Sequence, residues 1–508
     1  MNTLQPGLPA LAEHSLDPRD WDTMRDLGHR MIDDMMDYLQ TIHERPVWLQ
    51  PTAEVKEGLQ QPLPLLPQDA VSVYEDFTRL VLPYNSSNVH PRFWGWVMGG
   101  GTPFGMLADM LASGMNTNVS IGDSAPMYVE RQVLDWSKQI FGFPRTASGL
   151  LTSGASMANI TAMIVARNHF DESIRQKGIR AVPAQMMVYG SSETHNCVIK
   201  GIEAIGLGSD HFRKVPVDDQ YRVRTDLLSA MIREDRAAGH QPFCVIGNAG
   251  TVNTGAIDDL TALAGIAKQE NVWFHIDGAF GAVPRLLPEF ADTLQGLELA
   301  DSLSFDFHKW LYVNYEVGCL LVRDASAHRA AFTSSVNYLV QHERGLSAGP
   351  DPFSNYGMEL SRGFKALKVW MLLKEHGMEQ YARQIRQNLD QAQYLGRLVG
   401  DRPELELLTD VSLNIVCYRF NPGKANGSDM ASGIGMASGM DMGDLNTLNK
   451  EILMRLHEQG IAAPSYTLLN GKYCIRVAIT NHRSRQKDFD ALVDATVQIG
   501  RELSRSHF

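Results

Sequence analysis

The sequence has few cysteines, and none of them are spaced as a metal site or a disulfide framework would require. Its 508 residues include five cysteines, and no Cys-x-x-Cys occurs. An odd number of scattered cysteines argues against a disulfide scaffold and against a structural zinc site. We therefore expect no metal site, reduced thiols and a cytoplasmic location.

The chain also lacks an excess of basic residues and long apolar runs. Lysine and arginine total 46 against 58 aspartates and glutamates, which gives a net charge of −12. That balance argues against binding to nucleic acid or to anionic membranes. No run approaches the ~18 apolar residues of a membrane-spanning helix, and the N-terminal segment lacks the basic start of a signal peptide. We expect a soluble protein that acts on a small molecule.

Several nucleotide and metal motifs are missing as well. The sequence contains no Gly-x-x-x-x-Gly-Lys-[Ser/Thr], no His-Glu-x-x-His, and no Gly-x-Gly-x-x-Gly after an apolar run. The backbone geometry and ligands that these motifs supply are therefore absent from the chain. Their absence counts against phosphate-loop ATPases, zinc peptidases and Rossmann oxidoreductases.

Short apolar runs that end in Gly, Ser or Asp alternate with helical patterns through the middle of the chain. The runs cover 186–189, 243–247, 272–277 and 303–305, and the helical patterns cover 156–169, 195–206 and 258–269. Strands that alternate with helices predict an α/β fold whose mostly parallel sheet is covered on both faces. In such sheets, ligands bind at the carboxyl ends of the strands.

The two ends of the chain differ from this pattern. Three-four spacing of apolar residues predicts a helix over 18–43, with Asp17 as its N-cap and Pro18 in its first turn. Toward the other end, a long helix over 364–400 leads into shorter strands, which indicates a separate and smaller domain. Within that domain, the Gly- and Met-rich stretch 423–444 has no periodicity and is predicted to be a flexible insertion.

Two segments that follow predicted strands carry small or polar residues suited to a cofactor. Thr152–Ser156 precedes a helix, where small residues and backbone N–H groups can cradle a phosphate. Serine and glycine are also ordinary helix caps, so this segment alone is not specific. His195 can stack on a flat ring or shuttle a proton, although a lone histidine is more often a capping residue.

Asp277 and Lys309 follow two further strands. A buried carboxylate needs a partner, and a protonated pyridine nitrogen is one such partner, with a backbone cap or an arginine as the commoner alternative. Lys309 lies among aromatic residues, and desolvation there favours a nucleophilic amine for Schiff-base chemistry over an ordinary surface lysine. The order and spacing of a phosphate cradle, a histidine, an aspartate and a lysine predict one cofactor site.

Together these segments resemble the pyridoxal-phosphate-dependent group II amino-acid decarboxylases, most closely the aromatic-L-amino-acid decarboxylases. The resemblance extends over nearly the whole chain and rests on His90–Trp94, Leu107–Leu111, Thr152–Asn159, His275–Ala279, Phe307–Trp310 and Leu360–Trp370. It implies the aminotransferase-like fold type I, with a mostly parallel seven-stranded sheet in a large domain and a small α+β C-terminal domain. The implied parts are an N-terminal helical dimerisation segment (1–95), a large pyridoxal-phosphate-binding domain (96–385) and a small domain (386–508).

The resemblance also implies the cofactor, pyridoxal 5'-phosphate, and a role for each matching residue. Lys309 would form the Schiff base, Asp277 would pair with the pyridine nitrogen, and His195 would stack on the ring. The remaining expected cofactor contacts are Ala155, Ser156 and Asp306 at the phosphate, His308 beside the lysine, Ala279 on the other ring face and Thr251 nearby. Tyr338 matches a tyrosine that protonates the substrate carbon.

The expected substrate contacts are Trp96, Gly99, Ser361 and Arg476. Trp96-Val97-Met98-Gly99 stands where relatives carry Tyr-Phe-Pro-Thr, and Ser361 favours a phenolic side chain. Arg476 matches an arginine that binds a substrate carboxylate in glutamate decarboxylases, with a structural salt bridge as the alternative. Asp306 replaces a usual asparagine, which places a negative charge near the phosphate.

These features predict an L-amino-acid α-decarboxylase with an aromatic substrate, which yields an amine and CO₂. The retained His195 and Tyr338 favour decarboxylation over aldehyde formation. The alternatives are a decarboxylase of acidic or diamino acids, and an aldehyde synthase, C–C lyase or aminotransferase on the same scaffold. The resemblance further implies a homodimer with shared active sites, clasped by the N-terminal helices.

Overall fold

A computed structural model describes residues 14–333, 342–423 and 441–506. The chain forms two compact units, one made of residues 1–45 and 52–83 and the other of residues 46–51 and 84–508. Residues 84–95, which we assigned to the N-terminal segment, therefore fall in the second unit. In the described part of the chain, no helix combines the length and apolar character needed to cross a membrane.

The first unit is built from three helices, α1 (Trp21–Gln40), α2 (Ala53–Gly58) and α3 (Ala70–Leu80). Helix α1 starts later than predicted, because the Asp20 carboxylate and not that of Asp17 accepts the backbone N–H groups of Asp22 and Thr23. An N-cap must reach the N–H groups two and three residues ahead, and Asp20 does so. The Tyr74 hydroxyl donates to Asp34 (2.8 Å) and ties α3 to α1.

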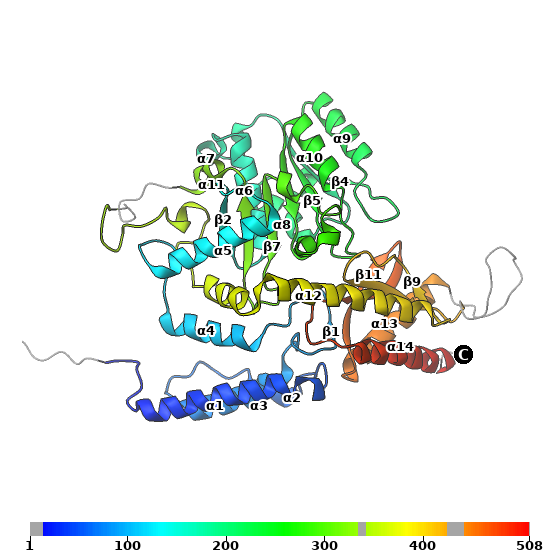
Figure 1. Cartoon of the computed structure of the whole chain (residues 1–508). Coiled ribbons are helices and arrows are strands. Elements are labelled where there is room, and N and C mark those ends of the chain that lie inside the picture. The colour runs from blue at the N-terminus through cyan, green and yellow to red at the C-terminus, as the bar shows by residue number, and fades with distance from the viewer. Residues whose placement is uncertain (1–13, 334–341, 424–440, 507–508) are drawn as a thin grey trace, which may run out of the picture. The chain divides into compact units, whose positions relative to one another are not determined.

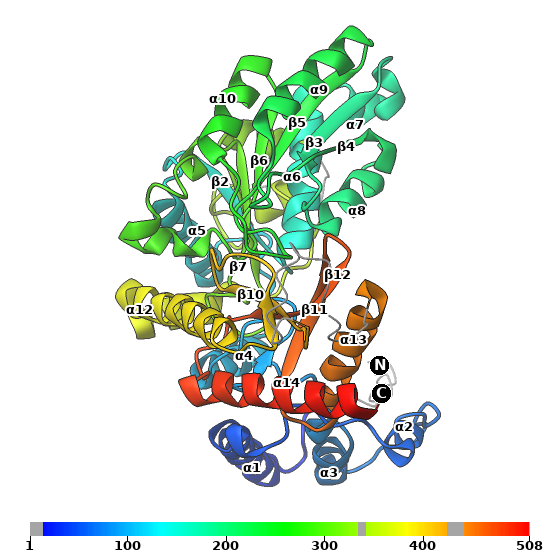
Figure 2. The same cartoon turned by 90° about the vertical axis from the view of Figure 1, so that its right-hand side faces the viewer.

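The second unit contains a seven-stranded sheet that confirms the predicted α/β fold (Figures 1 and 2). The strand order is β2-β8-β7-β6-β5-β3-β4, and only β8 runs antiparallel to its neighbours. The strands are β2 (Ser148–Thr152), β3 (Met186–Ser191), β4 (Phe212–Val215), β5 (Gln241–Asn248), β6 (Trp273–Asp277), β7 (Ser302–Asp306) and β8 (Gly318–Val322).

Alternating side chains of each strand bury against helices on opposite faces of this sheet. In β3, Met186 and Val188 belong to a core with α6, α8 and α11, whereas Met187 and Tyr189 belong to a core with α5, α9 and α10. This alternation follows from the two-residue period of a strand. The helices are α4 (Pro103–Met115), α5 (Ala125–Phe141), α6 (Ala155–Phe170), α7 (Ile174–Lys177), α8 (Asn196–Ala204), α9 (Thr225–Ala237), α10 (Leu260–Glu270) and α11 (Ala325–Phe332).

A second, five-stranded sheet has the order β1-β11-β12-β10-β9. Its elements are β1 (Phe93–Trp94), β9 (Leu405–Leu407), β10 (Ile415–Phe420), β11 (Ala463–Leu469) and β12 (Lys472–Ala478), with α12 (Ala366–Gly400), α13 (Met442–Glu458) and α14 (Gln486–Ser506). Helix α12 contacts α4 and α5 as well as β9 and β10. The division that we placed between residues 385 and 386 falls inside this helix.

The predicted insertion 423–444 ends earlier than expected. Helix α13 begins at Met442, and the Asp441 carboxylate caps it by accepting the N–H group of Asp444 (2.9 Å). The Asp444 carboxylate in turn accepts the N–H group of Asp441, which completes a capping box. Residues 424–440 lie outside the described residues, so the flexibility that we predict for them stays a prediction.

A buried ion pair joins α5 to the segment that precedes α12. The Arg362 guanidinium donates to the Glu130 carboxylate and to the backbone oxygens of Val119 (2.8 Å) and Leu151 (2.9 Å). Both charged side chains are almost completely buried. Burial is the main influence on Glu130 and raises the pKa of its carboxyl, while Arg362 acts in the opposite direction.

We expect Arg362→Met to destabilise the protein by about 3–5 kcal/mol, because it leaves the Glu130 carboxylate buried without its partner. Without the opposing guanidinium, the folded-state pKa of Glu130 rises further above its unfolded value. The loss should therefore be small at mildly acidic pH and grow as the pH rises. Urea unfolding followed by circular dichroism measures it. The double variant Glu130→Gln with Arg362→Met should recover part of the loss, and a pH-independent loss would contradict this account.

Candidate functional site

A cavity of 410 Å³ lies where the carboxyl ends of the central strands meet the start of α6. It brings together nine of the residues predicted from the sequence: Trp96, Ala155, Ser156, His195, Asp277, Ala279, Asp306, His308 and Lys309. These residues come from positions far apart in the chain, and strand ends gather them at one edge of the sheet. The cavity is therefore the candidate active site.

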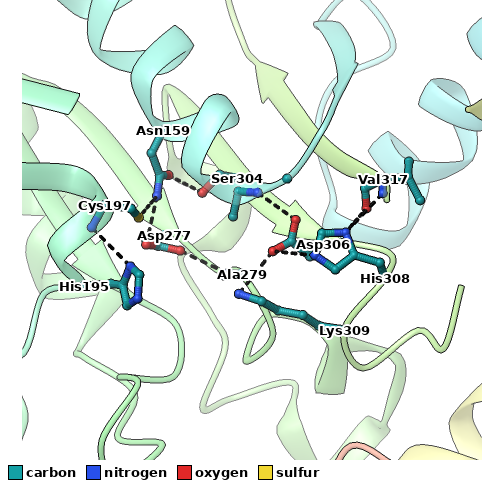
Figure 3. A network of polar contacts seen from close by, with 12 residues as sticks. Asn159, His195, Cys197, Asp277, Ala279, Ser304, Asp306, His308, Lys309 and Val317 are labelled. Carbon is teal, nitrogen blue, oxygen red and sulfur yellow. Dashed lines mark hydrogen bonds and ion pairs between the residues drawn. The ribbon is translucent and has the colours of Figure 1, made fainter. Parts of the chain in front are cut away.

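Lys309 stands three residues beyond the end of β7, and its amine points to Asp306 (Figure 3). The Lys309 Nζ lies 3.1 Å from Asp306 Oδ2. Gly99 fixes the backbone under the lysine: its N–H donates to His308 O (3.2 Å), and a Cβ on Gly99 would lie 2.3 Å from Lys309 O. Only glycine fits this approach, so Gly99 supports the lysine segment and does not line the cavity.

Asp277 ends β6, and its buried carboxylate is held from two sides. Oδ2 accepts a hydrogen bond from Asn159 Nδ2 (3.0 Å), and Oδ1 accepts one from Ala279 N (3.1 Å). Asn159 is held in turn, because its Oδ1 accepts from His275 Nε2 (2.8 Å) and from Ser304 Oγ (2.5 Å). Burial lowers the pKa of His275 to about 4. A neutral His275 donates to Asn159, and this chain of bonds fixes the direction of the Asp277 carboxylate.

His195 serves both as a helix cap and as part of the cavity wall. Its Nδ1 accepts the N–H group of Cys197 (3.2 Å) at the start of α8. Burial lowers the pKa of His195, and the nearby Asp277 opposes that effect. The imidazole is therefore neutral at neutral pH and presents a flat uncharged ring to the cavity.

His308 is anchored beside the lysine. Its Nδ1 contacts the backbone of Val317, and its ring lies 4.4 Å from the ring of Tyr315, centre to centre. Burial lowers the pKa of His308 as well, with Asp306 opposing. The two histidines that line the described cavity are therefore neutral at neutral pH, and its other basic side chain is Lys309.

The start of α6 is shaped to receive an anion. Gly154 precedes the helix and has no side chain of its own to cap it, and Asp306 Oδ1 accepts the first amide, that of Ala155. A Cβ on Gly154 would lie 3.3 Å from His308 Cε1, so a side chain there would crowd the space beside Ala155 and Ser156. Backbone N–H groups and the helix dipole favour a phosphate at such a position. The cavity thus offers an amine, a buried carboxylate and a phosphate cradle, which together fit pyridoxal phosphate.

The fold and this donor set define a pyridoxal-phosphate enzyme of the aminotransferase-like fold. The chain belongs to the pyridoxal-dependent decarboxylases: residues 52–421 match the model described as "Pyridoxal-dependent decarboxylase conserved domain". It is 31% identical to the aromatic-L-amino-acid decarboxylase of Bacillus atrophaeus, over 95% of this chain and 97% of that protein. It is 28% identical to the phenylacetaldehyde synthase of Arabidopsis thaliana, over 91% and 93%.

Solved structures agree with this fold. The structure of Oryza sativa TDC with PLP and tryptamine superposes with a TM-score of 0.86 at 24% identity, covering 96% of this chain and all of that one (100%). The family membership, the fold and the site together show a pyridoxal-phosphate-dependent amino-acid decarboxylase.

The remaining four predicted residues are Thr251, Ser361, Tyr338 and Arg476. The buried Thr251 Oγ1 bonds to Thr254 Oγ1 (3.0 Å) and accepts the N–H group of Ala256 (3.1 Å). Thr251 therefore shapes its loop, and the residues on either side of it, Gly250 and Val252, line the cavity. Ser361 is exposed and does not line it. Tyr338 lies outside the described residues, and its role stays a prediction.

Arg476 is the fourth, and it bonds to neutral oxygens only. Nη1 donates to Trp96 O (2.7 Å) and to Ser465 Oγ (3.1 Å), and Nε donates to Asn253 O (3.2 Å). None of the ion pairs between described residues includes it. Burial lowers the pKa of Arg476 to about 10, so the side chain stays charged at neutral pH. It holds two backbone segments beside the cavity, and the alternative of a structural salt bridge is not seen among the described residues.

Sequence reasoning missed Asn159, Cys197, Tyr315 and Glu316. Asn159 stands one helical turn after Ala155, a spacing that places both on one face of α6 and could have identified it. Cys197, Tyr315 and Glu316 line the cavity only because α8 and the loop before β8 fold over it. No local pattern in the sequence marks them.

We expect Asn159→Leu to weaken pyridoxal phosphate binding about tenfold, because it leaves Asp277 less well oriented and His275 without its acceptor. Cofactor release under dialysis, followed by absorbance, measures the change. Thr161→Val is the control on the same helix, since the Thr161 hydroxyl bonds only to Met157 O of its own helix. Equal cofactor retention in the two variants would show that Asn159 does not position Asp277.

Proposed function

We propose that the protein removes the α-carboxylate of an aromatic L-amino acid, giving the amine and CO₂. Aromatic and apolar side chains form much of the cavity wall, namely Trp96, Val97, Phe280 and Tyr315. No arginine lines the described cavity, and its one lysine is Lys309. An acidic substrate side chain would therefore lack a cationic partner, whereas an aromatic ring would meet matching surfaces.

The observation that carries the proposal is the meeting of Lys309, Asp277 and the α6 N-terminus in one cavity. Pyridoxal phosphate, when bound, supplies an electron-withdrawing ring that accepts the electron pair left by departing CO₂. Asp277 would hold the proton of the ring nitrogen, and Ala155 and Ser156 would hold the phosphate. The neutral His195 would support the ring face, and Lys309 would supply the amine that binds the cofactor.

Aldehyde formation is the alternative reaction, because one relative of this chain is a phenylacetaldehyde synthase. His195 is present and lines the cavity. Tyr338 is present in the sequence, and we propose it as the group that protonates the substrate carbon. Both residues favour amine formation.

A panel of amino acids should separate these activities. We expect phenylalanine, tyrosine or tryptophan to exceed glutamate and 2,4-diaminobutyrate by about 100-fold or more in kcat/KM, since a mismatched pocket costs a few kcal/mol. Amine, CO₂, aldehyde and hydrogen peroxide are measured together. Preference for glutamate, or peroxide formed in step with CO₂, would overturn the proposal.

The Lys309→Ala variant should lose the cofactor adduct that borohydride fixes in the wild-type protein. A persistent adduct would refute the assignment of Lys309.

We also propose a homodimer. In the second unit, α4 leaves Met110, Leu111 and Met115 about half exposed. In the first unit, α1 leaves Trp21 and Met24 exposed. Clustered apolar side chains of this kind are typical of interfaces, and a second copy of the chain is the simplest partner.

We also infer a cytoplasmic location, because the five free thiols fit a reducing compartment.

Replacing Leu111 and Met115 together by glutamate should turn the dimer into monomers, because buried charges at an interface are costly. Sedimentation velocity measures the change. Leu299→Glu is the matched control, since Leu299 is equally exposed but lies apart from α4. If wild-type protein sediments as a monomer, or if all variants behave alike, the α4 interface is wrong.

A further inference from the structure

Asp306 occupies the anion-binding end of the cavity. Its Oδ1 accepts the N–H group of Ala155 (2.7 Å), which is the first amide of α6 and an expected phosphate donor. Its Oδ2 lies 3.1 Å from Lys309 Nζ and 3.8 Å from His308 Nε2. Figure 3 shows the Asp306 carboxylate beside the lysine amine. A carboxylate of this chain thus already uses the cradle that a phosphate would use.

The Asp306 carboxylate has little room to leave. The side chain is 2% exposed, and its backbone N–H donates to Ala279 O (3.0 Å). Two glycines close around it: a Cβ on Gly318 would lie 2.6 Å from Oδ1, and one on Gly154 would lie 3.6 Å from it. A phosphate that enters the cradle therefore meets a carboxylate that stays in place.

Few charged groups lie close enough to offset the charge of the Asp306 carboxylate. The titratable groups that interact with it are Lys309, His308, His195, Tyr315 and Cys319. Burial lowers the pKa of both histidines and raises that of Tyr315 and Cys319, so these four are neutral at neutral pH. The remaining basic group is Lys309, and its amine is needed at the cofactor's aldehyde. Two adjacent anions in a poorly solvated site repel strongly.

We propose that Asp306 takes up a proton from solvent when the cofactor phosphate binds, and that its protonated Oδ2 then donates a hydrogen bond to a phosphate oxygen. Because the bound state holds one more proton than the free state, cofactor affinity falls as the pH rises. The inference rests on the cofactor and is independent of which amino acid is decarboxylated.

Calorimetry of the full-length protein, freed of cofactor, tests this proton uptake. Titrations with pyridoxal phosphate and with pyridoxal are each run in two buffers of different ionisation enthalpy, at a pH where free phosphate is dianionic. Pyridoxal closes to a hemiacetal through its free 5'-hydroxyl, but opening that hemiacetal releases and takes up no net proton, so the difference in proton uptake between the two ligands reports the phosphate. We expect pyridoxal phosphate to take up about one proton more than pyridoxal. Equal uptake by the two ligands would overturn the proposal.

The Asp306→Asn variant should remove the linkage. Its amide can donate to phosphate without a proton from solvent. The Kd of the wild-type protein should rise about tenfold per pH unit relative to that of the variant, over the range where Asp306 is ionised in the free protein. Asp226→Asn, an exposed change of the same charge on α9, should follow the wild type. If the Asn variant does not fold, the comparison of the two ligands on the wild type still decides.

Spectroscopy of the holoenzyme locates the proton. The infrared spectrum should show the carbonyl stretch of a protonated carboxyl that is absent in Asp306→Asn and present in Asp226→Asn. The ³¹P spectrum should report a dianionic phosphate in both. A monoanionic phosphate, or an unchanged infrared band in Asp306→Asn, would place the proton elsewhere and refute the proposal. Failure of pyridoxal phosphate itself to bind would instead count against the cofactor assignment.

Discussion

The structure depends on the need to satisfy a carboxylate buried at the end of a central strand. Asp277 is held by Asn159, which is held by His275 and Ser304. These residues lie on α6, β6 and β7, so one polar chain links three elements of the sheet layer. An unpaired carboxylate at this depth would be costly. The hydrogen bonds around Asp277 lower that cost, and a cationic ring nitrogen would supply the remaining partner. The positions of the other cavity residues follow from that arrangement.

The C-terminal sheet contributes to the cavity without lining it. Asn253 Nδ2 donates to Glu193 Oε2 (2.9 Å), and its Oδ1 accepts from Thr467 Oγ1 (2.7 Å). Arg476 then bonds to the backbone of both Asn253 and Trp96. The cavity wall, the histidine segment after β3 and strands β11 and β12 therefore form one connected network. Substitutions in the smaller sheet can alter the site through this network.

The sequence was most informative about functional residues that belong to a local sequence pattern. Lys309, Asp277 and His195 each follow a strand, and strand ends converge in an α/β sheet, so their meeting was predictable. The antiparallel direction of β8 was not predictable, because the alternation of strands and helices along the sequence does not show which strand runs the other way. Thr251 and Arg476 matched a family pattern, yet their side chains turn to loop and backbone partners that only tertiary packing determines.

Contacts between distant parts of the second unit set an order on its assembly during synthesis. Chain that has emerged as far as β8 already contains Lys309, Asp277 and α6. The wall at Trp96, however, is held by Arg476, and β1 pairs with β11. The ribosome must therefore release nearly the whole chain before the cavity is complete. A chain that ends before β11 lacks the residues that hold this wall, so it presents the cofactor with an unfinished cavity.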